Sequence, residues 1–390
     1  MEGWQTVKNS RLKDKLRILE INDAYEGGGA EVVFQKTARL LKERGHSVHL
    51  YADKKLPKIE SKDVFRYIFS FRQQERLKNI LEEKKPDIVH IHNFYHYLSP
   101  SILRYLMRWK KEMRFKIAMT IHDYHFLCAN NGCVRWKGDV PETCEDCRGR
   151  RYHKILFNRC DPRGFSFNIL KFLQHFVSYN LFHFDKGIDL FIVPSLFLKN
   201  KLHSFCGEEK AVLLHNPAFD LEKKREQIHR LSLSLEEDFE SIYIGRIDAV
   251  KGLMHFISQD YDPKRFGKFL VVGDGDLAYK KNLVDLVREK GFIQDIRFLG
   301  RKSHLEALSY LFKAKRLVFP SIWYENCPLV VLEARLLGKE VFHYGLGSIE
   351  EILSLDEKEL SEKVYVERLL EIFSSLARDK EKVLENGRAR

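Results

Sequence analysis

Short apolar runs that alternate with amphipathic segments limit the fold of this 390-residue chain more than any other feature of its sequence. The runs are rich in Val, Ile and Leu, as buried strands are, and the segments between them place apolar residues at helical spacing. Strands that alternate with helices form a parallel sheet covered by helices on both faces. In the first half the predicted strands are 16–21, 47–51, 87–92, 115–121, 189–193 and 211–214, and the predicted helices are 30–44, 71–83, 101–113 and 167–184.

A second series of the same kind follows His215-Asn216-Pro217. Pro217 disfavours a helical conformation at the residue before it, so this tripeptide reads as a hinge. We therefore expect an α/β chain of two doubly wound domains, residues 1–215 and 216–360, followed by a helix and tail at 361–390. Ligands of such domains bind at the carboxyl ends of the strands. The second series consists of a charged helical stretch at 221–240 and strands at 241–245, 269–273, 296–300, 317–320 and 340–343.

The composition excludes several classes of protein. Hydrophobic residues make up 44% of the chain and charged residues 31%, which is a globular composition and not that of a disordered or collagen-like chain. No apolar run approaches the roughly 18 residues of a membrane-spanning helix, and the polar N-terminus predicts no signal peptide. The odd number of cysteines, seven, argues against a full disulfide framework. We expect a cytoplasmic protein.

The net charge of +12 comes entirely from the first half of the chain. Residues 1–215 hold 38 Lys and Arg against 25 Asp and Glu, whereas residues 216–390 hold 29 against 30. A basic half is typical of proteins that bind nucleic acid, an anionic membrane surface or an acidic substrate. It also occurs as a Lys-rich solvated surface.

Three glycine-containing segments follow predicted strands. Glycines in the first, Glu26 to Glu31 (EGGGAE), would let the backbone approach a phosphate or a sugar, although a plain tight turn explains them as well. In the second, the cations of Gly245-Arg246 and Lys251-Gly252 would flank a diphosphate, or would simply be solvated. The third, Gly273-Asp274-Gly275-Asp276, falls at the same predicted sheet edge.

The segment from Pro320 to Ala334 (PSIWYENCPLVVLEA) carries the most information. Pro328 suits the first turn of a helix, and the backbone N–H groups near 326–329 would point at an anion. Glu325 and Glu333, with seven residues between them, would then hold sugar hydroxyls and a ribose on either side of that anion. A carboxylate near a first turn also favours the helix dipole without any ligand.

These motifs together resemble the retaining GT-B glycosyltransferases of family 4, the group 1 transferases. The resemblance covers nearly the whole chain in the right order, and no single motif is specific. It rests on the E-x7-E pair Glu325 and Glu333, Gly-Gly-Ala-Glu at 28–31, His122, Asn216-Pro217, Gly245-Arg246 with Lys251-Gly252, Gly273-Asp274-Gly275, and Phe298-Leu299-Gly300.

The resemblance implies a role for each matching position. Arg246 and Lys251 would neutralise the donor diphosphate, Glu333 would bind the ribose, and Glu325 and His122 would contact the donor sugar. The tail at 361–390 would pack back on the N-terminal domain, which would bind the acceptor. The remaining donor-binding positions are Gly28, Gly29, Gly245, Gly273, Gly300, Arg301, Asn326, Cys327, Pro328 and Leu329.

One departure from the family pattern concerns donor specificity. Such transferases often carry an aromatic-Gly or Gly-aromatic pair after the first Glu, where this chain has Asn326-Cys327. The chemistry needs no catalytic metal, because Arg, Lys and a helix N-terminus stabilise a departing diphosphate. Asp274-Gly275-Asp276 has the form of a D-x-D metal motif, but in the family this turn is not a metal site. No carboxylate nucleophile is evident.

Residues 123–165 break the strand–helix pattern and form a predicted insertion with a cysteine-rich composition. Cys144-x2-Cys147 has metal-ligand spacing, and a structural zinc ion would close a loop that lacks its own core. Reduced thiols and a disulfide are the alternatives. A subgroup of the family has a similar pattern, which implies Cys128, Cys144, Cys147 and Cys160 as the ligands and leaves out Cys133.

The segment 101–116 (SILRYLMRWKKEMRFK) places Arg104, Arg108 and Lys111 on one helical face and apolar residues on another. Such a helix suits an anionic membrane surface, or it packs on the sheet with a solvated basic face. His90 and His92 share one face of a strand and read as hydrogen-bonded histidines more than as metal ligands.

We therefore expect a retaining GT-B enzyme that moves a sugar from a UDP- or GDP-type donor to a glycan or lipid-linked acceptor. We expect a cytoplasmic enzyme, peripheral at the inner face of the plasma membrane, that acts in bacterial surface polysaccharide assembly and binds no nucleic acid. The alternatives are a basic nucleic-acid-binding protein with a zinc ribbon, and another GT-B sugar-nucleotide enzyme such as an epimerase.

Overall fold

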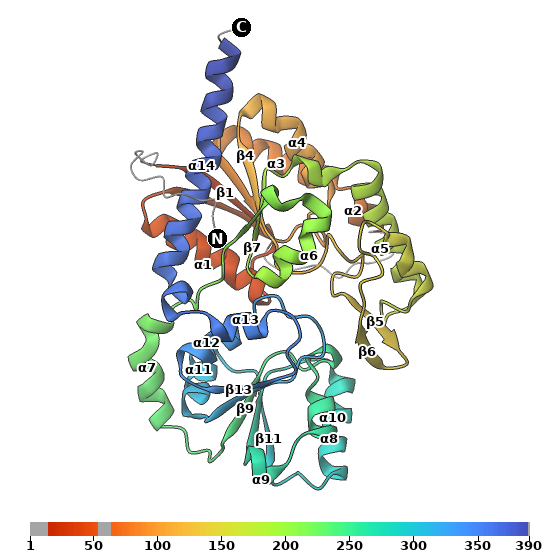
Figure 1. The fold of residues 1–390 in the computed structure, drawn as a ribbon, viewed down its shortest axis with the longest axis vertical. Helices are drawn as coiled ribbons and strands as arrows, with labels where there is room; N and C mark the ends of the chain where they lie inside the picture. Colours follow the sequence, from red (N-terminus) through yellow and green to blue (C-terminus); the bar gives the residue numbers. More distant parts are fainter. Residues whose placement is uncertain (1–14, 54–63, 389–390) are drawn as a thin grey trace. The chain divides into compact units, whose positions relative to one another are not determined.

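The computed structural model describes residues 15–53 and 64–388, which form two parallel sheets and a two-stranded hairpin (Figure 1). Contacts within the chain divide it into two compact units. The first unit consists of Met1–Ile121, Val177–Ile192 and Lys363–Arg390, and the second of His122–Phe176 and Val193–Glu362. The insertion and residues 193–215 are thus grouped with the second sheet, whereas the boundary drawn from the sequence lies at 215.

The first sheet has the strand order β2-β1-β3-β4-β7-β8, with the order reversing between β1 and β3. Its strands are nearly continuous apolar runs, because helices cover both faces of a parallel sheet. In β3, for example, Ile88, Val89 and Ile91 are fully buried. The strands are β1 (Arg17–Ala24), β2 (Ser47–Asp53), β3 (Ile88–Ile91), β4 (Lys116–Thr120), β7 (Leu190–Val193) and β8 (Ala211–Leu213).

The helices connected to this sheet bury one apolar stripe each. In α3, Leu77 and Leu81 lie four residues apart and are fully buried. The elements are α1 (Gly29–Glu43), α2 (Val64–Ile68), α3 (Phe71–Lys84), α4 (Ser101–Met113), α6 (Leu196–Cys206), η4 (Phe184–Gly187) and η5 (Glu208–Lys210).

Helix α4 buries the apolar side that the sequence analysis considered for a membrane surface. Ile102, Leu106 and Trp109 are buried, and Lys110 Nζ donates a hydrogen bond to Asp189 Oδ1 at 2.6 Å. Arg104, Arg108 and Lys111 are exposed. The structure therefore favours the second interpretation of this segment, a helix packed on its sheet with a solvated basic face.

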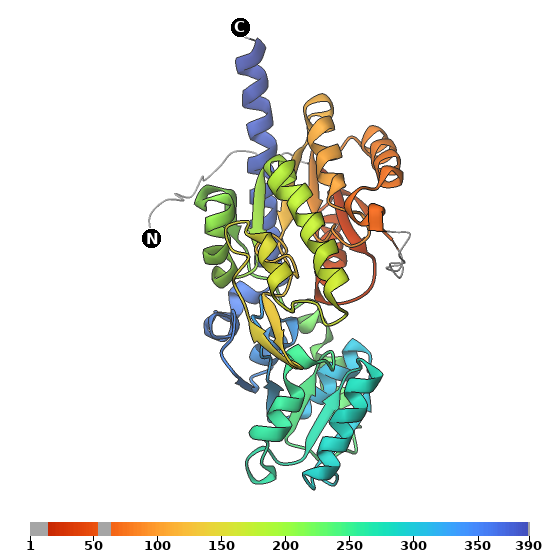
Figure 2. The same cartoon turned by 90° about the vertical axis from the view of Figure 1, so that its right-hand side faces the viewer.

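The second sheet has the order β11-β10-β9-β12-β13, and its paired strands run parallel. Ile242 and Tyr243, which are neighbours on β9, enter two separate apolar cores, so both faces of the sheet are covered (Figure 1; Figure 2). The strands are β9 (Ser241–Ile244), β10 (Phe269–Val272), β11 (Ile296–Gly300), β12 (Arg316–Phe319) and β13 (Glu340–His343).

One helix next to the second sheet is shorter than predicted. The charged helix expected at 221–240 ends at Leu233. The helices and 3₁₀ turns that precede, connect or follow the strands of the second sheet are α7 (Leu221–Leu233), α8 (Leu253–Gln259), α9 (Pro263–Phe266), α10 (Leu277–Glu289), α11 (His304–Lys313), α12 (Leu329–Leu336), α13 (Ile349–Ser354), η6 (Ala249–Lys251) and η7 (Glu357–Leu360).

The C-terminal helix α14 (Glu362–Arg388) packs within the first unit. Tyr365 and Thr37 of α1 share a hydrogen bond of 2.8 Å, and Phe373 lies edge-on to His90 of β3, with ring centroids 5.1 Å apart. Figure 1 shows α14 in blue beside α1. These contacts bury the described N-terminal part of α14 against the first sheet.

The insertion is a loop-rich segment with little secondary structure of its own. It contains the antiparallel hairpin β5 (Val134–Lys137) and β6 (Val140–Thr143) and the 3₁₀ turn η2 (Tyr152–Phe157), and it is followed by the helix α5 (Phe165–His175), which continues as the π-helical turn η3 (Phe176–Leu181). Helix α5 packs against η2.

Candidate functional site

Two glycine-containing turns touch each other at the carboxyl ends of β9 and β10. A Cβ atom at Gly273, where φ is 150°, would lie 1.8 Å from the carbonyl oxygen of Gly245. A Cβ atom at Gly275 would lie 1.9 Å from the carbonyl oxygen of Ile247. Only glycine fits at such distances. Two of the turns predicted from the sequence therefore meet at one edge of the second sheet.

Glu325 lies in the loop after β12 with its carboxylate nearly buried, at 6% exposure. Its Oε1 accepts hydrogen bonds from Lys251 Nζ at 2.7 Å, Trp323 Nε1 at 2.6 Å and Ser321 Oγ at 2.5 Å. Three donors on one oxygen, one of them a cation, fix the orientation of the carboxylate. The backbone of Glu325 also pairs with Gly347, where a Cβ atom would lie 2.1 Å from the Glu325 carbonyl oxygen.

Lys251 and Arg246 lie on the loop after β9 and are linked through Asp248. The Asp248 carboxylate caps η6 by accepting a hydrogen bond from the Lys251 backbone N–H at 3.1 Å, and it also pairs with the Arg246 guanidinium. Gly252, with φ at 71°, brings this loop against Pro320 at the end of β12. The Lys251 side chain is 18% exposed and that of Arg246 is 62% exposed. One cation is therefore fixed on Glu325, while the other extends toward solvent.

Glu333 is the fifth residue of α12 and is nearly buried. Its Oε1 lies 2.6 Å from Nε2 of His304, which begins α11. His304 was not predicted as a site residue from the sequence, where it shows only as the residue after the helix-capping Ser303. Gly300, with φ at 69°, and the exposed Arg301 precede it on the same loop.

The N-terminus of α12 presents the segment 326–329 that the sequence marked as an anion site. Pro328 is the N-cap residue and Leu329 the first helical residue. Asn326 is buried, and its Oδ1 accepts a hydrogen bond from Ser195 Oγ at 2.8 Å. Burial raises the pKa of the Cys327 thiol to about 12, which keeps it protonated, and Asn216 hydrogen-bonds to it. The first N–H groups of a helix have no partner inside the helix, so they remain for an anion.

The cysteine-rich insertion packs directly on the residues before Glu325. A Cβ atom at Gly132 would lie 3.3 Å from the Trp323 ring, and the rings of Tyr124 and Tyr324 are 6.2 Å apart. Lys201 of α6 lies with its ammonium 4.4 Å from the centroid of the Tyr324 ring. The insertion therefore forms one wall of the Trp323–Glu325 loop.

The other predicted residues lie elsewhere in the fold. Gly28 and Gly29 lie at the start of α1 in the first unit, where the Gly28 N–H donates to Glu31 Oε2 at 2.7 Å. His122 follows β4 and is half-buried. Asp274 pairs with Lys280, which lowers the pKa of that carboxyl, and Asp276 caps α10. Both carboxylates of the D-x-D sequence thus have structural roles.

Two family models match the chain in succession. One, described as Glycosyltransferase Family 4, matches residues 27–218, and one described as Glycosyl transferases group 1 matches residues 224–389. The chain belongs to the group 1 glycosyltransferases of GT-B fold. The fold class that the sequence predicted, an α/β chain with two parallel, doubly wound sheets, is confirmed.

Individual relatives of this glycosyltransferase are distant. A 42.6 kDa protein of the cps region of Klebsiella pneumoniae is 24% identical over 84% of each chain. The Anabaena protein HepE, solved in complex with UDP, is 15% identical over 94% of each chain, with a TM-score of 0.54. Sucrose-phosphate synthase from Thermosynechococcus elongatus is 16% identical over 94% of each chain, with a TM-score of 0.58. Likeness at these identities establishes the fold.

Five cysteines of the glycosyltransferase lie in its insertion. The Cys128 thiol is within hydrogen-bonding reach of the thiols of Cys133 and Cys147, and these two contacts lower the pKa of Cys128 well below its usual value. Burial and the charge of a Cys128 thiolate raise the pKa of Cys160 to about 12. Cys144 bonds through its backbone N–H to the Cys133 carbonyl at 2.7 Å. Cys133, which the predicted ligand set leaves out, is therefore a neighbour of Cys128.

These thiols fit a zinc ion in chemical type. A tetrahedral zinc–thiolate site needs sulfur atoms about 3.8 Å apart, given Zn–S bonds of about 2.3 Å. In the described part of the chain, no three cysteine sulfurs lie within 4.8 Å of one another. Because the thiols of Cys128 and Cys147 already lie within reach of each other, a bound ion would have to draw further cysteine sulfurs toward this pair.

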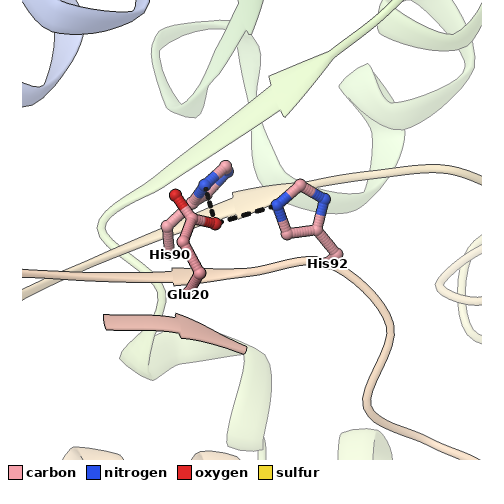
Figure 3. Close-up of side chains that lie close together, drawn as sticks. All are labelled: Glu20, His90 and His92. Atoms are coloured by element: carbon pink, nitrogen blue, oxygen red, sulfur yellow. Dashed lines mark hydrogen bonds and ion pairs between the residues drawn. The ribbon is translucent and has the colours of Figure 1, made fainter. Parts of the chain in front are cut away.

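The described residues hold one group of three His, Cys, Asp or Glu side chains whose ligand atoms lie within 4.8 Å of one another: Glu20, His90 and His92 (Figure 3). Glu20 on β1 is in register with His90 on β3. Oε2 of Glu20 lies 2.8 Å from His90 Nδ1 and 3.0 Å from His92 Nε2, and all three residues are buried. Since one carboxylate oxygen already accepts both histidines, we interpret the group as a buried hydrogen-bond network of the first sheet.

Proposed function

We propose that this glycosyltransferase moves a sugar from a nucleotide diphosphate sugar, of the UDP or GDP type, to a glycan or lipid-linked acceptor with retention of configuration. The observation that supports the proposal most strongly is the set of groups at the carboxyl ends of the second sheet. Lys251 is bonded to Glu325, Arg246 extends beside it, and the N-terminus of α12 follows in the chain. HepE, which has the same fold, was solved with UDP.

Each group has a distinct task in this proposal. Arg246, Lys251 and the backbone amides of 326–329 bind the diphosphate and stabilise the negative charge that develops on it as the glycosidic bond breaks. Glu333, held by His304, binds the ribose hydroxyls, and Glu325 binds hydroxyls of the donor sugar. The acceptor hydroxyl oxygen attacks the anomeric carbon from the face that the diphosphate leaves. The departing phosphate oxygen takes the proton of that hydroxyl.

The biological setting that we propose is the assembly of a bacterial surface polysaccharide. The relative in the Klebsiella pneumoniae cps region supports this setting, although it is only 24% identical. No helix among the described residues is long and apolar enough to cross a membrane.

A nucleotide panel on wild type and Glu333→Ala tests the donor site. We expect one base family to raise the melting temperature, because a ligand at roughly a hundredfold excess over its Kd stabilises the folded state by about 2.7 kcal/mol. Glu333→Ala should weaken this nucleotide's binding about 100-fold, since two hydrogen bonds to a charged group are lost. Glu350→Ala, on an exposed carboxylate of α13, should bind like wild type. Stabilisation by duplex DNA and by no nucleotide would reject the proposal.

We propose further that the insertion holds one structural zinc ion through Cys128, Cys144, Cys147 and Cys160. Protein prepared without chelator should contain about one zinc per chain, and Cys147→Ser should lose most of it and melt about 5–10 °C lower. Cys206→Ser, outside the insertion, should keep its zinc, and Cys133→Ser tests whether that thiol is a ligand. Metal analysis and melting curves are the measurements. A wild-type zinc content near zero after growth in added zinc would contradict the proposed zinc site.

A further inference from the structure

Helix α5 has its polar and apolar sides reversed. Its buried residues are Asn168, Lys171, Gln174 and His175. Its exposed residues are apolar: Phe165 at 59% exposure, Ile169 at 40%, Leu173 at 40% and Phe176, the residue that follows α5, at 43%. A surface helix normally buries its apolar stripe and leaves its polar side to water. These four apolar residues are called the α5 face below.

The buried polar side has a structural explanation. Asn168 Nδ2 donates hydrogen bonds to the carbonyl oxygens of Ile155 and Asn158, at 3.0 and 2.8 Å. Lys171 pairs with the buried Asp161 at 2.8 Å, and His175 Nε2 lies 3.0 Å from the His125 carbonyl oxygen. The loops of the insertion lack an apolar core, so α5 holds them through hydrogen bonds. This use of the polar side turns the apolar side outward.

The α5 face has no such explanation among the residues that the structure describes. Its residues are spaced by four, four and three positions, so they form one continuous stripe on the helix. Single exposed apolar residues, such as Leu233 and Leu277, are normal on a protein surface. A stripe of four large side chains, two of them phenylalanines, marks a surface that another molecule covers.

The charges around the stripe identify the kind of partner. Residues 148–176 contain seven Lys and Arg and one Asp. Arg151 and Arg159 are exposed. Arg163 is exposed as well, although it pairs with Asp161, and its guanidinium lies 4.0 Å from the centroid of the Phe167 ring at the start of α5. Exposed aromatic and aliphatic side chains in a segment with such an excess of arginines have the composition that binds the interface of an anionic bilayer. The same charge would repel a second copy of this surface.

We propose that the α5 face docks on an anionic lipid bilayer, with its apolar side chains in the interfacial region and the flanking arginines on lipid phosphates. The docking itself does not depend on the donor chemistry, and only its use to reach a lipid-linked acceptor rests on the proposed function. This location differs from α4, which the sequence analysis considered for a membrane surface, because α4 buries its apolar side.

Vesicle sedimentation tests the proposal. Wild type should bind vesicles with about 30% anionic lipid, and bind neutral vesicles much more weakly, because arginine–phosphate attraction adds to apolar burial. Ile169→Gln/Leu173→Gln should weaken binding about 100-fold, since each withdrawn side chain is worth about tenfold. Phe165→Ser, which changes one exposed ring, should weaken it about tenfold. The matched control Leu233→Gln/Leu277→Gln removes two exposed leucines elsewhere and should bind like wild type.

Melting temperature and nucleotide binding should be unchanged in all of these variants, because the altered side chains are exposed and lie outside the proposed donor site. Wild type that ignores anionic vesicles would overturn the proposal, as would an Ile169→Gln/Leu173→Gln protein that binds them like wild type. Sedimentation velocity tests the alternative that a second copy of the chain covers the α5 face. If wild type is a dimer that does not bind vesicles, and Ile169→Gln/Leu173→Gln is a monomer, the α5 face is a self-association surface. Failure of nucleotide binding alone would reject the proposed function and leave the lipid result standing.

Discussion

Lys251→Ala is expected to lower kcat/KM for sugar transfer by about 10²–10³-fold, the loss typical of removing one preorganised charge donor. The Lys251 ammonium lies 2.7 Å from Glu325 Oε1 and is surrounded by the rings of Trp323 and Phe319, at 5.1 and 5.7 Å from their centroids. Partial burial strengthens its field at Glu325 and at the proposed position of the donor diphosphate. The alanine variant loses the charge at both places at once.

Steady-state kinetics with the donor identified in the nucleotide panel provide the measurement. Lys251→Arg retains the charge with a different shape and should recover part of the activity. Lys268→Ala is the matched control, because this lysine is 56% exposed and lies just before β10, at the sheet edge opposite the site. A Lys251→Ala enzyme within about threefold of wild type would contradict the assigned role, given the loss expected from a charge donor.

The fold was predictable because its signals are local. β-branched runs such as 269–273 become central strands whichever helices cover them, and all strands of the second series are found within a residue or two of the predicted bounds. The glycines at 273 and 252 were predictable for a related reason. Turns at strand ends in a parallel sheet face one edge, so residues that follow different strands come together there.

The missed features depend on contacts between distant residues. His304 meets Glu333 only because the loop after β11 lies against α12, and nothing in the local sequence at 304 predicts that. The direction of α5 was equally hidden. Its aromatic composition predicts a packed helix, and the outward apolar side follows from the hydrogen-bonding needs of the insertion, a property of the whole segment.

The network of Glu20, His90 and His92 was predictable in part. A single carboxylate inside the apolar strand 16–21 is a visible signal, and so are the two histidines at 90 and 92, two residues apart in the predicted strand 87–92. The three side chains meet because the register of β1 and β3 places Glu20 opposite His90, and the sequence does not specify this register. The pattern predicted hydrogen-bonded histidines, and the structure adds the buried carboxylate that both of them share.

Glu20→Gln is expected to lower the stability of the first unit by about 3 kcal/mol at pH 7. Burial alone would raise the pKa of Glu20, but the contacts with His90 and His92 outweigh it and lower this pKa from 4.5 to about 2. A carboxyl whose pKa is lower in the folded state adds stability that is complete above 4.5 and is lost as the pH falls from 4.5 toward 2. Glutamine removes the charge at every pH.

Native-state hydrogen exchange of β1 and β3 is the suitable measurement, because it reports the stability of the first unit separately from the second. The difference between wild type and Glu20→Gln should narrow as the pH falls below 4.5, where wild type loses the same charge. Glu43→Gln, on a half-exposed carboxylate of α1, should change stability by less than about 0.5 kcal/mol. An equal difference at pH 7 and pH 3 would show that the cost comes from packing and would refute the electrostatic explanation.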